Sequence, residues 1–388
     1  MPHAYGLDAP SLRLVERATA LAQGEVARHA QDVDQEARFP REALTSLAEA
    51  KFWGLCIAKE RGGLGAGPAA FAGVVEELAQ RCGSTAMVYT MHVVAAQMVA
   101  ASTTLAGRDA LLAEMAAGRH LTTLAFSEKG SRSQFWAPVS KLEAHGGHFV
   151  TDAEKSWVTS AHEAQSYVSS AQQPGAKSPM ESTLYLVRRD QRGLNLVRGF
   201  DGLGLRGNDS APVTFHRLEV QPSDLLTAQG AGATGMLQVV LPWFIVGTAA
   251  MAHGLCRAAL AATTAHLQAG AFAHSGTTLR DLPTLRARVA DMSIRTEQSR
   301  ALLGHALAHM AEGSPVTALC LLQARAAALE AASSVTDLAM KACGGAAFSK
   351  QGGVERLFRD ARAGWVMAPT VDHLHEFVGR ALTGLPLF

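Results

Sequence analysis

The feature that most constrains this fold is a change in hydrophobic period at two places along the chain. Up to about residue 119, apolar side chains recur every three or four positions, which is the spacing of amphipathic helices. From residue 120 to about 230, short β-branched runs alternate with turn residues, which predicts antiparallel strands. The helical period then returns. The chain is therefore predicted to be α+β and mostly α, with a helical domain (1–119), a barrel-like β domain (120–230) and a second helical domain (231–388).

Charge and cysteine content exclude several classes of protein. The 388 residues carry 35 Lys and Arg against 34 Asp and Glu, so no net field favours nucleic acid or an anionic membrane. The five cysteines form no C-x-x-C pair and the N-terminus has no signal-peptide pattern, so we expect a reduced, cytoplasmic protein. The apolar run 236–255 includes a glutamine, a proline and a histidine, which favours a buried helix over a membrane anchor. Because no H-E-x-x-H motif occurs and His373 and His375 are only two positions apart, no metal site is predicted.

The stretch from Leu124 to Ala161 carries the residue types that a flavin site needs. A short apolar strand leads to Ser127 in a Gly/Ser-rich turn, and a hairpin then brings up Trp157 and Thr159. An isoalloxazine ring requires a flat side chain against it, and hydroxyl and backbone N–H groups for its carbonyl oxygens and N5. The same residues are also compatible with an ordinary β-hairpin and a solvated Ser-rich turn.

Four motifs in this order resemble those of the acyl-CoA dehydrogenase superfamily over nearly the whole chain. The family's T-E-P-x-x-G-S-D turn corresponds to Ser127–Gln134, and its K-x-W-I-T-N pattern to Lys155–Ser160. Its G-x-R-G-S loop corresponds to Gly204–Asp209. Its late G-G-x-G run and R-D-x-R helix correspond to Gly344–Ala347 and Arg359–Arg362. Each motif alone is weak, but the ordered set is specific.

The resemblance implies a fold, a cofactor and an assembly. The fold would be an N-terminal helical domain, a β domain and a C-terminal four-helix bundle, assembled as a homotetramer or homodimer. FAD would lie between the β domain and the bundle. By position in the motifs, Ser127 would face the pyrimidine edge of the flavin, Trp157 would flank the ring and Thr159 would reach N5. The further cofactor contacts that the resemblance implies are Ser133, Gly344, Gly345 and Thr370. Lys341 replaces the glutamine that the family has before the two glycines, and we expect it to compensate in part for a lost phosphate contact.

The chain departs from the family pattern where a dehydrogenase keeps its base. An acyl-CoA dehydrogenase removes the α-proton of a thioester with a glutamate. At the usual position this sequence has Ala368, and at the alternative family position it has Phe244. The nearest acid, Asp372, is one helical turn further on. The stretch 271–279 also lacks the arginine that reaches the FAD pyrophosphate in the family, a loss of roughly 1.5–3 kcal/mol that predicts looser flavin binding.

These departures favour one branch of the superfamily, the two-component flavin-dependent monooxygenases. Such enzymes take reduced FAD, or FMN, from a separate flavin reductase and pass one oxygen atom of O2 to a substrate in a dry cavity. We expect a small aromatic or heteroaromatic substrate, with indole-type compounds as one candidate. His92 is predicted to contact the substrate or the reactive oxygen, with a structural role as the competing interpretation. The predicted substrate cavity is lined by His92, Trp243, Phe244, Trp365, Met367 and Ala368.

Two other functions remain open from the sequence. The first is an acyl-CoA dehydrogenase with a displaced base, which a carboxylate near a bound thioester would support. The second is a binding protein that has lost its enzymatic activity. Retention of Ser133, Trp157 and Thr159 argues against the second.

Overall fold

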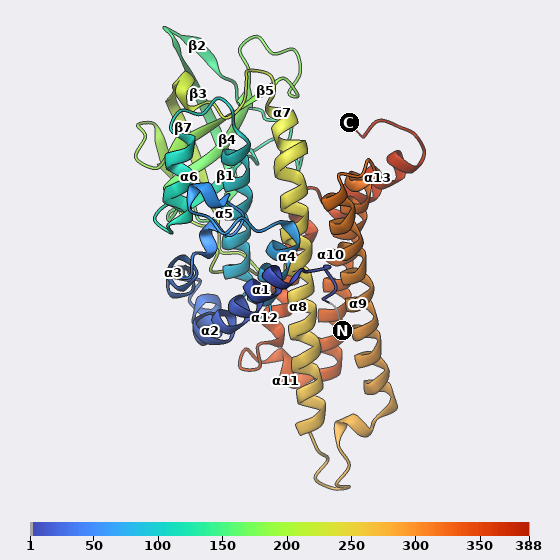
Figure 1. The fold of residues 1–388 in the computed structure, drawn as a ribbon. Coiled ribbons are helices and arrows are strands. Elements are labelled where there is room, and N and C mark those ends of the chain that lie inside the picture. The colour runs from blue at the N-terminus through green and yellow to red at the C-terminus, as the bar shows by residue number, and fades with distance from the viewer. Residues whose placement is uncertain (1–2, 388) are drawn as a thin grey trace.

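The computed structural model describes residues 3–387 and has the three-part architecture that the hydrophobic period predicts (Figure 1). The N-terminal part is helical, and most of its core lies around α5, which is buried along nearly its whole length. Its helices are α1 (Ala9–Leu21), η1 (Ala22–Val26), α2 (Ala27–Gln35), α3 (Arg41–Glu49), the short η2 (Phe52–Gly54) and η3 (Lys59–Arg61), α4 (Pro68–Ala79), α5 (Gly83–Ala101) and α6 (Arg108–Ala116).

The β domain consists of two small sheets that enclose their own core. The first has the order β1-β4-β5 and the second β2-β3-β7-β6. Tyr167 and Tyr185 from the first sheet pack with Phe149, Phe215 and Leu218 from the second. The strands are β1 (Thr122–Ala125), β2 (Glu143–His145), β3 (His148–Val158), β4 (Ser166–Gln172), β5 (Ser182–Arg188), β6 (Leu194–Leu196) and β7 (Ala211–Val220).

One pairing differs from the predicted all-antiparallel arrangement, because β1 runs parallel to β4. Parallel neighbours need a crossover connection. Here the connection passes through the second sheet, since β2 and β3 lie between β1 and β4 in the chain. The opposite face of the first sheet, including Leu124, Val168 and Leu186, packs into the core shared with the helices.

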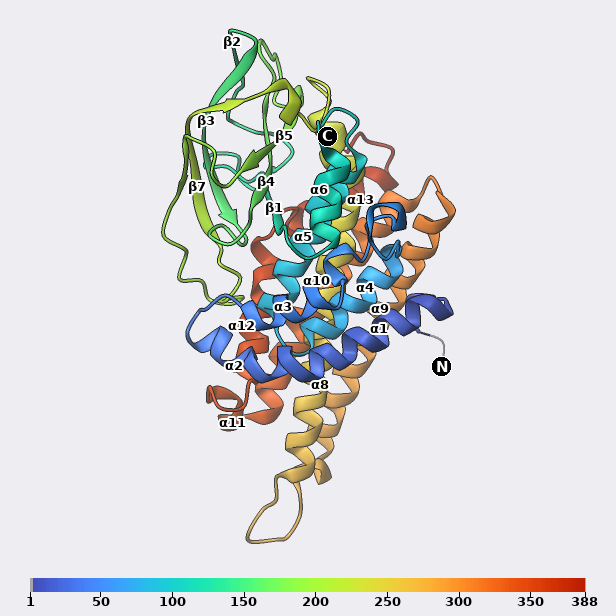
Figure 2. The same ribbon diagram turned by 60° about the vertical axis from the view of Figure 1, so that its left-hand side comes forward.

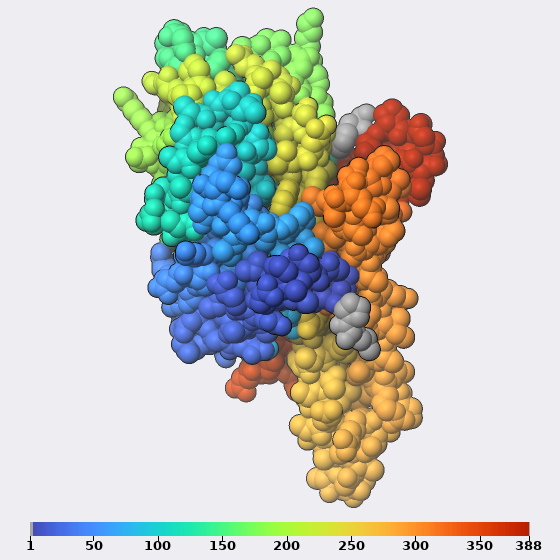
Figure 3. Space-filling view, viewed as in Figure 1, coloured from blue at the N-terminus to red at the C-terminus, as the bar shows by residue number. Residues whose placement is uncertain are grey.

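The C-terminal part is a bundle of long helices, which confirms the expected fold class. Its turn between α8 and α9 projects away from the β domain at the far end of the molecule (Figures 1 and 2). The space-filling view shows the same hairpin protruding beyond the rest of the surface (Figure 3). The elements after the β domain are η4 (Pro222–Asp224), α7 (Gly232–Gly235), η5 (Met236–Val240), α8 (Leu241–Ala269), η6 (Leu279–Asp281), α9 (Pro283–Glu312), α10 (Thr317–Cys343), α11 (Gly345–Phe348), α12 (Val354–Val366) and α13 (Val371–Leu382).

Helix α8 is the apolar segment that the sequence marked, and it lies inside the protein. The continuous helix Gly232–Ala269 is long and apolar enough to cross a membrane, but its most apolar window is mostly buried by other elements. It packs closely on α4: a Cβ added at Gly254 would lie 2.5 Å from the carbonyl oxygen of Glu76, so only glycine permits this approach. Its burial and close packing are those of a core helix.

A buried polar network joins the N-terminal part to the bundle. Glu76 on α4 is 1% exposed, and its carboxylate accepts hydrogen bonds from Arg257 (2.6 Å) and Tyr5. The Arg300 guanidinium lies 3.1 Å from the same carboxylate, and the Tyr5 hydroxyl also contacts Nδ1 of His253 at 2.9 Å. Because the carboxylate has two cationic partners, its burial is compensated, and the network connects α4 to α8 and α9.

Candidate functional site

A cavity of about 990 Å3 lies where the β domain meets both helical parts. One wall is formed by β1, the turn that follows it, the end of β3 and the loop 200–210. The facing wall comes from α5, the start of α8 and the end of α12. The cavity therefore occupies the position between β domain and bundle that the sequence analysis assigned to the flavin.

The polar wall contains the predicted hydroxyl groups. Ser127, Ser133 and Thr159 all line the cavity. Within residues 3–387, none of these three hydroxyl groups makes a hydrogen bond to another protein atom, so each is available to a ligand. The backbone of Ser133 has φ +66°. This conformation is unfavourable for any residue other than glycine, and it occurs often in turns at functional sites.

Trp157 presents an exposed indole to the cavity. Its side chain is 57% exposed, although it belongs to β3, and its φ is +55°. The backbone shift next to it is a β-bulge, since the register with β7 changes between Lys155 and Val158. The bulge turns the indole out of the strand pattern, and Phe200 stacks on it with 4.0 Å between ring centroids. A flat aromatic surface is thus available beside the free hydroxyl groups.

A buried ion pair supports this wall and joins two of the family motifs. Glu128, directly after Ser127, pairs with Lys155, and both side chains are almost fully buried. The Glu128 carboxylate also accepts hydrogen bonds from the backbone N–H groups of Val139 (2.6 Å) and Ser140 (2.7 Å). Burial opposes its charge, but the Lys155 ammonium and the Ser140 hydrogen bonds outweigh this and lower the pKa of Glu128. The carboxylate is therefore held ionised and fully engaged.

The opposite end of the cavity is apolar and aromatic. Phe244, Met367 and Ala368 line it together with Trp365, which is 54% exposed and donates from Nε1 to the Ser333 hydroxyl at 2.8 Å. Met87 and Met91 from α5, which were not predicted, also line the cavity. The one carboxylate among the lining residues is Glu128, which the Lys155 pair already occupies.

His92 is the clearest correction to the predicted site. It is 1% exposed and is not one of the residues that line the cavity. Its Nδ1 accepts a hydrogen bond from the backbone N–H of Thr122 at 3.2 Å, so Nε2 carries the proton and donates to the Trp53 carbonyl at 3.1 Å. Burial lowers its pKa to about 4. His92 is thus a neutral histidine that joins α5 to β1 and to the N-terminal part.

The remaining predicted residues lie outside the cavity. Trp243 packs against Phe71, with 5.7 Å between ring centroids, because adjacent residues on a helix point about 100° apart and Phe244 takes the cavity side. Lys341 is exposed and pairs with Asp337 at 2.6 Å. Gly344, Gly345 and Thr370 do not line the cavity of this single chain; Thr370 instead caps α13.

Sequence reasoning missed two cations near the apolar end. Arg362 lines the cavity, with its guanidinium carbon 4.7 Å from the Trp365 ring centroid. Arg325 is fully buried behind Phe244, 4.9 Å from that ring centroid, and donates to the Met367 carbonyl at 3.2 Å. Its Nε and Nη1 atoms have no partner within residues 3–387, and burial lowers its pKa to about 9. No local pattern could have marked it, because its neighbours come from other helices.

The lining residues fit a flavin. A flat tricyclic ring needs an aromatic surface, polar groups at one edge and a dry opposite face. Trp157 supplies the surface, the three unbonded hydroxyl groups supply the polar edge, and Phe244 and Met367 supply the apolar face. The cavity volume of about 990 Å3 is large enough for a ring system and a small substrate.

Comparison with known proteins gives the same fold. Bovine mitochondrial short-chain specific acyl-CoA dehydrogenase is 28% identical over 343 residues, covering 88% of this chain and 82% of that protein. FadE25 of Mycobacterium tuberculosis, a probable acyl-CoA dehydrogenase, is 25% identical over 366 residues, covering 94% of this chain and 92% of that protein.

Solved structures agree over almost the entire chain. Butyryl-CoA dehydrogenase from Megasphaera elsdenii superposes with a TM-score of 0.92 at 20% identity, covering 97% of this chain and 99% of that one. The FAD complex of PigA superposes with a TM-score of 0.90 at 18% identity, covering 97% and 98%. At these identities the likeness establishes the fold alone.

Family models cover all three parts of the chain in order. The acyl-CoA dehydrogenase N-terminal domain matches residues 11–119, the middle domain residues 123–218 and the C-terminal domain residues 234–382. The matched segments correspond to the helical part, the β domain and the bundle described above. The chain belongs to the acyl-CoA dehydrogenase superfamily, and its fold is that of the flavin-dependent oxidoreductases in this family.

Proposed function

We infer that the chain binds FAD in the cavity and acts as a flavin-dependent monooxygenase on a small aromatic or heteroaromatic substrate. The observation that carries this proposal is that the described lining holds no free carboxylate. Positions 244 and 368 both line the cavity and hold phenylalanine and alanine. Among residues 3–387, Glu128 is the only carboxylate in the lining, and it is ionised, buried and paired with Lys155. The described lining therefore offers no free carboxylate to remove the α-proton of a thioester.

Residues of the polar wall would hold and orient the cofactor. The hydroxyl groups of Ser127 and Thr159 would bond to the polar edge of the ring, and Trp157 would lie against it. Ser133 lies in the turn whose backbone approaches the cavity, and would contact the same edge or the chain attached to the ring. When bound in its reduced form, FAD supplies the two electrons with which O2 is split between substrate and water.

Residues of the apolar end would hold the substrate and exclude water. Trp365 offers an exposed indole for stacking, and Phe244, Met367 and Ala368 present apolar surface. The Arg362 guanidinium is the charged group beside the indole. The small side chain at position 368 leaves room for a flat ring, and an indole-type compound would fit the aromatic surroundings. Exclusion of water protects a reactive oxygen species from wasteful decay.

Several partners follow from this proposal. A separate flavin reductase would supply the reduced cofactor, because the stretch 271–279 lacks the arginine that would hold flavin firmly. FMN remains the second candidate for the cofactor. We also propose a homotetramer or homodimer, in which residues outside this cavity, such as Lys341, Gly344, Gly345 and Thr370, could serve a neighbouring subunit's cofactor.

The experiment that tests the proposal follows the oxygen atoms. Protein with reduced FAD is mixed with ¹⁸O2 and indole, and the products are analysed by mass spectrometry. Incorporation of one labelled atom, dependent on the protein, is the expected result. The matched control is Phe244→Glu, which places a charge in the apolar end and should lose the product while the fold is retained.

The second candidate is an acyl-CoA dehydrogenase with a displaced base, favoured by the activities named for the relatives. Anaerobic mixing of the FAD-loaded protein with a panel of acyl-CoA thioesters distinguishes the two. Bleaching of the flavin by any thioester, without O2 or reductase, would replace the monooxygenase proposal with the dehydrogenase.

A further inference from the structure

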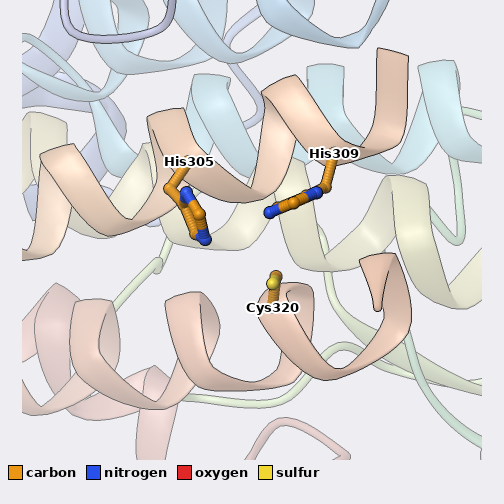
Figure 4. A group of neighbouring side chains, drawn as sticks. All are labelled: His305, His309 and Cys320. Atoms are coloured by element: carbon orange, nitrogen blue, oxygen red, sulfur yellow. The ribbon is translucent and has the colours of Figure 1, made fainter. Parts of the chain in front are cut away.

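A second group of chemically reactive side chains lies on the bundle, outside the cavity. His305 and His309 are one turn apart on α9, and Cys320 faces them from the first turn of α10 (Figure 4). The nitrogen and sulfur atoms that could bind a metal all lie within 4.8 Å of one another. The two helices meet here near the turn that connects them, so the group bridges two elements.

The residue types are those that bind a borderline-soft divalent cation. Two histidines at i and i+4 lie on one helix face, which is the spacing used by zinc-binding helices. A thiolate from a second element is the third ligand type that zinc prefers. In a tetrahedral zinc site, bonds of ~2.0 Å to nitrogen and ~2.3 Å to sulfur place the two nitrogen atoms roughly 3.3 Å apart and each nitrogen roughly 3.5 Å from the sulfur. Side-chain rotations that bring the ligand atoms closer by up to about 1.5 Å would reach that geometry.

None of the three ligands is committed to another partner. Within residues 3–387, the side chains of His305, His309 and Cys320 make no hydrogen bond, and Cys320 forms no disulfide. Nδ1 of His309 is buried without a hydrogen-bond partner. The two imidazole rings stand almost perpendicular, at 88°, with 4.5 Å between their centroids. The rings therefore converge without stacking, as ligands around one ion do.

Burial divides the group into a closed side and an open side. Cys320 is 7% exposed, His309 is half-buried and His305 is exposed. An ion could enter past His305, and water could fill the fourth coordination position. The packed interior behind Cys320 would hold the thiolate in place.

We propose that His305, His309 and Cys320 form a zinc site that joins the end of α9 to the start of α10. The role is structural, because none of the three residues lines the flavin cavity. The site would fix the hairpin at Gly313, where Thr317 already donates to the His309 carbonyl at 2.9 Å. It is independent of the function proposed above, and the protein would bind the ion with or without flavin.

The test uses Co²⁺ as a spectroscopic substitute for zinc in the full-length, thiol-reduced protein. One equivalent of Co²⁺ should produce a sulfur-to-cobalt charge-transfer band in the near ultraviolet, and Zn²⁺ should remove it. Cys320→Ser should abolish the band, and His305→Ala should weaken binding by at least about tenfold. His305 is exposed, so this variant tests the ligand without disturbing the core.

Matched controls separate the site from adventitious binding. Cys56→Ser removes another free thiol and His148→Ala breaks a second pair of neighbouring histidines, His145 and His148; both variants should keep the band. Zinc should also raise the thermal midpoint of the wild type but not of Cys320→Ser. The proposal is overturned if no thiolate band forms at one equivalent, if the band survives Cys320→Ser, or if either control variant loses it.

Discussion

The buried pair of Glu128 and Lys155 makes the sharpest quantitative prediction. Lys155 is 1% exposed, and its ammonium donates to the Ser170 carbonyl (2.7 Å) as well as to Glu128. Replacing it with methionine leaves an ionised carboxylate buried with no cation beside it and leaves Ser170 without this donor. Such a loss costs about 3–5 kcal/mol of unfolding free energy. Glu128→Gln strands the ammonium instead, so we expect a cost of the same size.

The double variant Glu128→Gln/Lys155→Met should recover most of the loss. A buried ion pair replaced as a unit often leaves stability unchanged or higher, because both desolvation penalties disappear together. The expected coupling energy between the two sites is therefore several kcal/mol, measured by denaturant unfolding of all four proteins. FAD affinity, measured by fluorescence quenching, should fall in each single variant and recover in part in the double variant, because the pair supports the wall at Ser127.

The residues next to Glu128 and Lys155 in the sequence provide a matched control. Lys129 and Glu154 form a similar pair at 3.1 Å, but their side chains are 80% and 62% exposed. Lys129→Met should cost less than about 1 kcal/mol, as exposed pairs do. The reasoning is refuted if Lys155→Met costs no more than Lys129→Met, or if the double variant loses the sum of both single losses.

Three further predictions concern the cavity and its surroundings. In Ala368→Glu, an acyl-CoA thioester should bleach bound FAD anaerobically at least about 100-fold faster than in the wild type or in Ala368→Gln. The reason is that a positioned general base accelerates proton abstraction by about that factor. Equal bleaching rates in the three proteins would contradict this prediction. His92→Gln should cost about 1–3 kcal/mol at neutral pH by disturbing two buried hydrogen bonds. The pKa of His92 is about 4 in the folded protein and 6.5 in the unfolded chain, so the unfolded chain binds the proton first as the pH falls. The unfolding free energy of the wild type should therefore decrease from pH 6.5 towards pH 4. His92→Gln should make that decrease smaller, as measured by urea titrations at several pH values. Arg325→Met should keep or raise stability, by up to about 3 kcal/mol, since it removes a buried charge that has no carboxylate partner within residues 3–387. Arg257→Met removes a cation from Glu76 and should destabilise. Thermal unfolding of both variants checks this order, and the opposite order would refute the argument.

The fold was predictable because its signals are local. The period of the apolar residues identified the helical and β parts, because buried and exposed positions alternate along most of the elements. The parallel pairing of β1 with β4 was not predictable in this way. It depends on a crossover through the second sheet, and the strands carry no mark of which neighbour they will meet.

The same difference between local and long-range signals separates the site residues that could be predicted from those that could not. Ser127, Trp157 and Thr159 lie close together in the sequence, so their motif placed them, and the structure brings all three to one cavity. His92 lies on α5, which is apolar on all sides and buried almost throughout, so the pattern did not indicate which face meets the cavity. Trp243 differs from Phe244 by one helical step, and that step decided which ring lines the cavity.

The metal-ligand group escaped the sequence analysis for a related reason. His305 and His309 have the spacing of a helical ligand pair, but the glutamate of the familiar zinc motif is absent between them. The third candidate, Cys320, belongs to the next helix, and only the packing of α9 against α10 brings its sulfur near the rings. Neither helix alone carries the complete set of ligands.

The replacements at positions 244 and 368 support the same conclusion, because both side chains line one cavity. They lie on different helices, α8 and the segment after α12, yet both side chains line the same apolar end. A carboxylate at either position would restore a base beside the substrate, so the loss of one could be offset by the other. The lining's remaining acid cannot take over, since Glu128 would have to leave Lys155 and the N–H groups of Val139 and Ser140 before it could accept a proton. As the motifs align, neither family position for the base therefore holds a carboxylate, while the hydroxyl groups and the indole that fit the flavin remain; this combination supports the proposed monooxygenase.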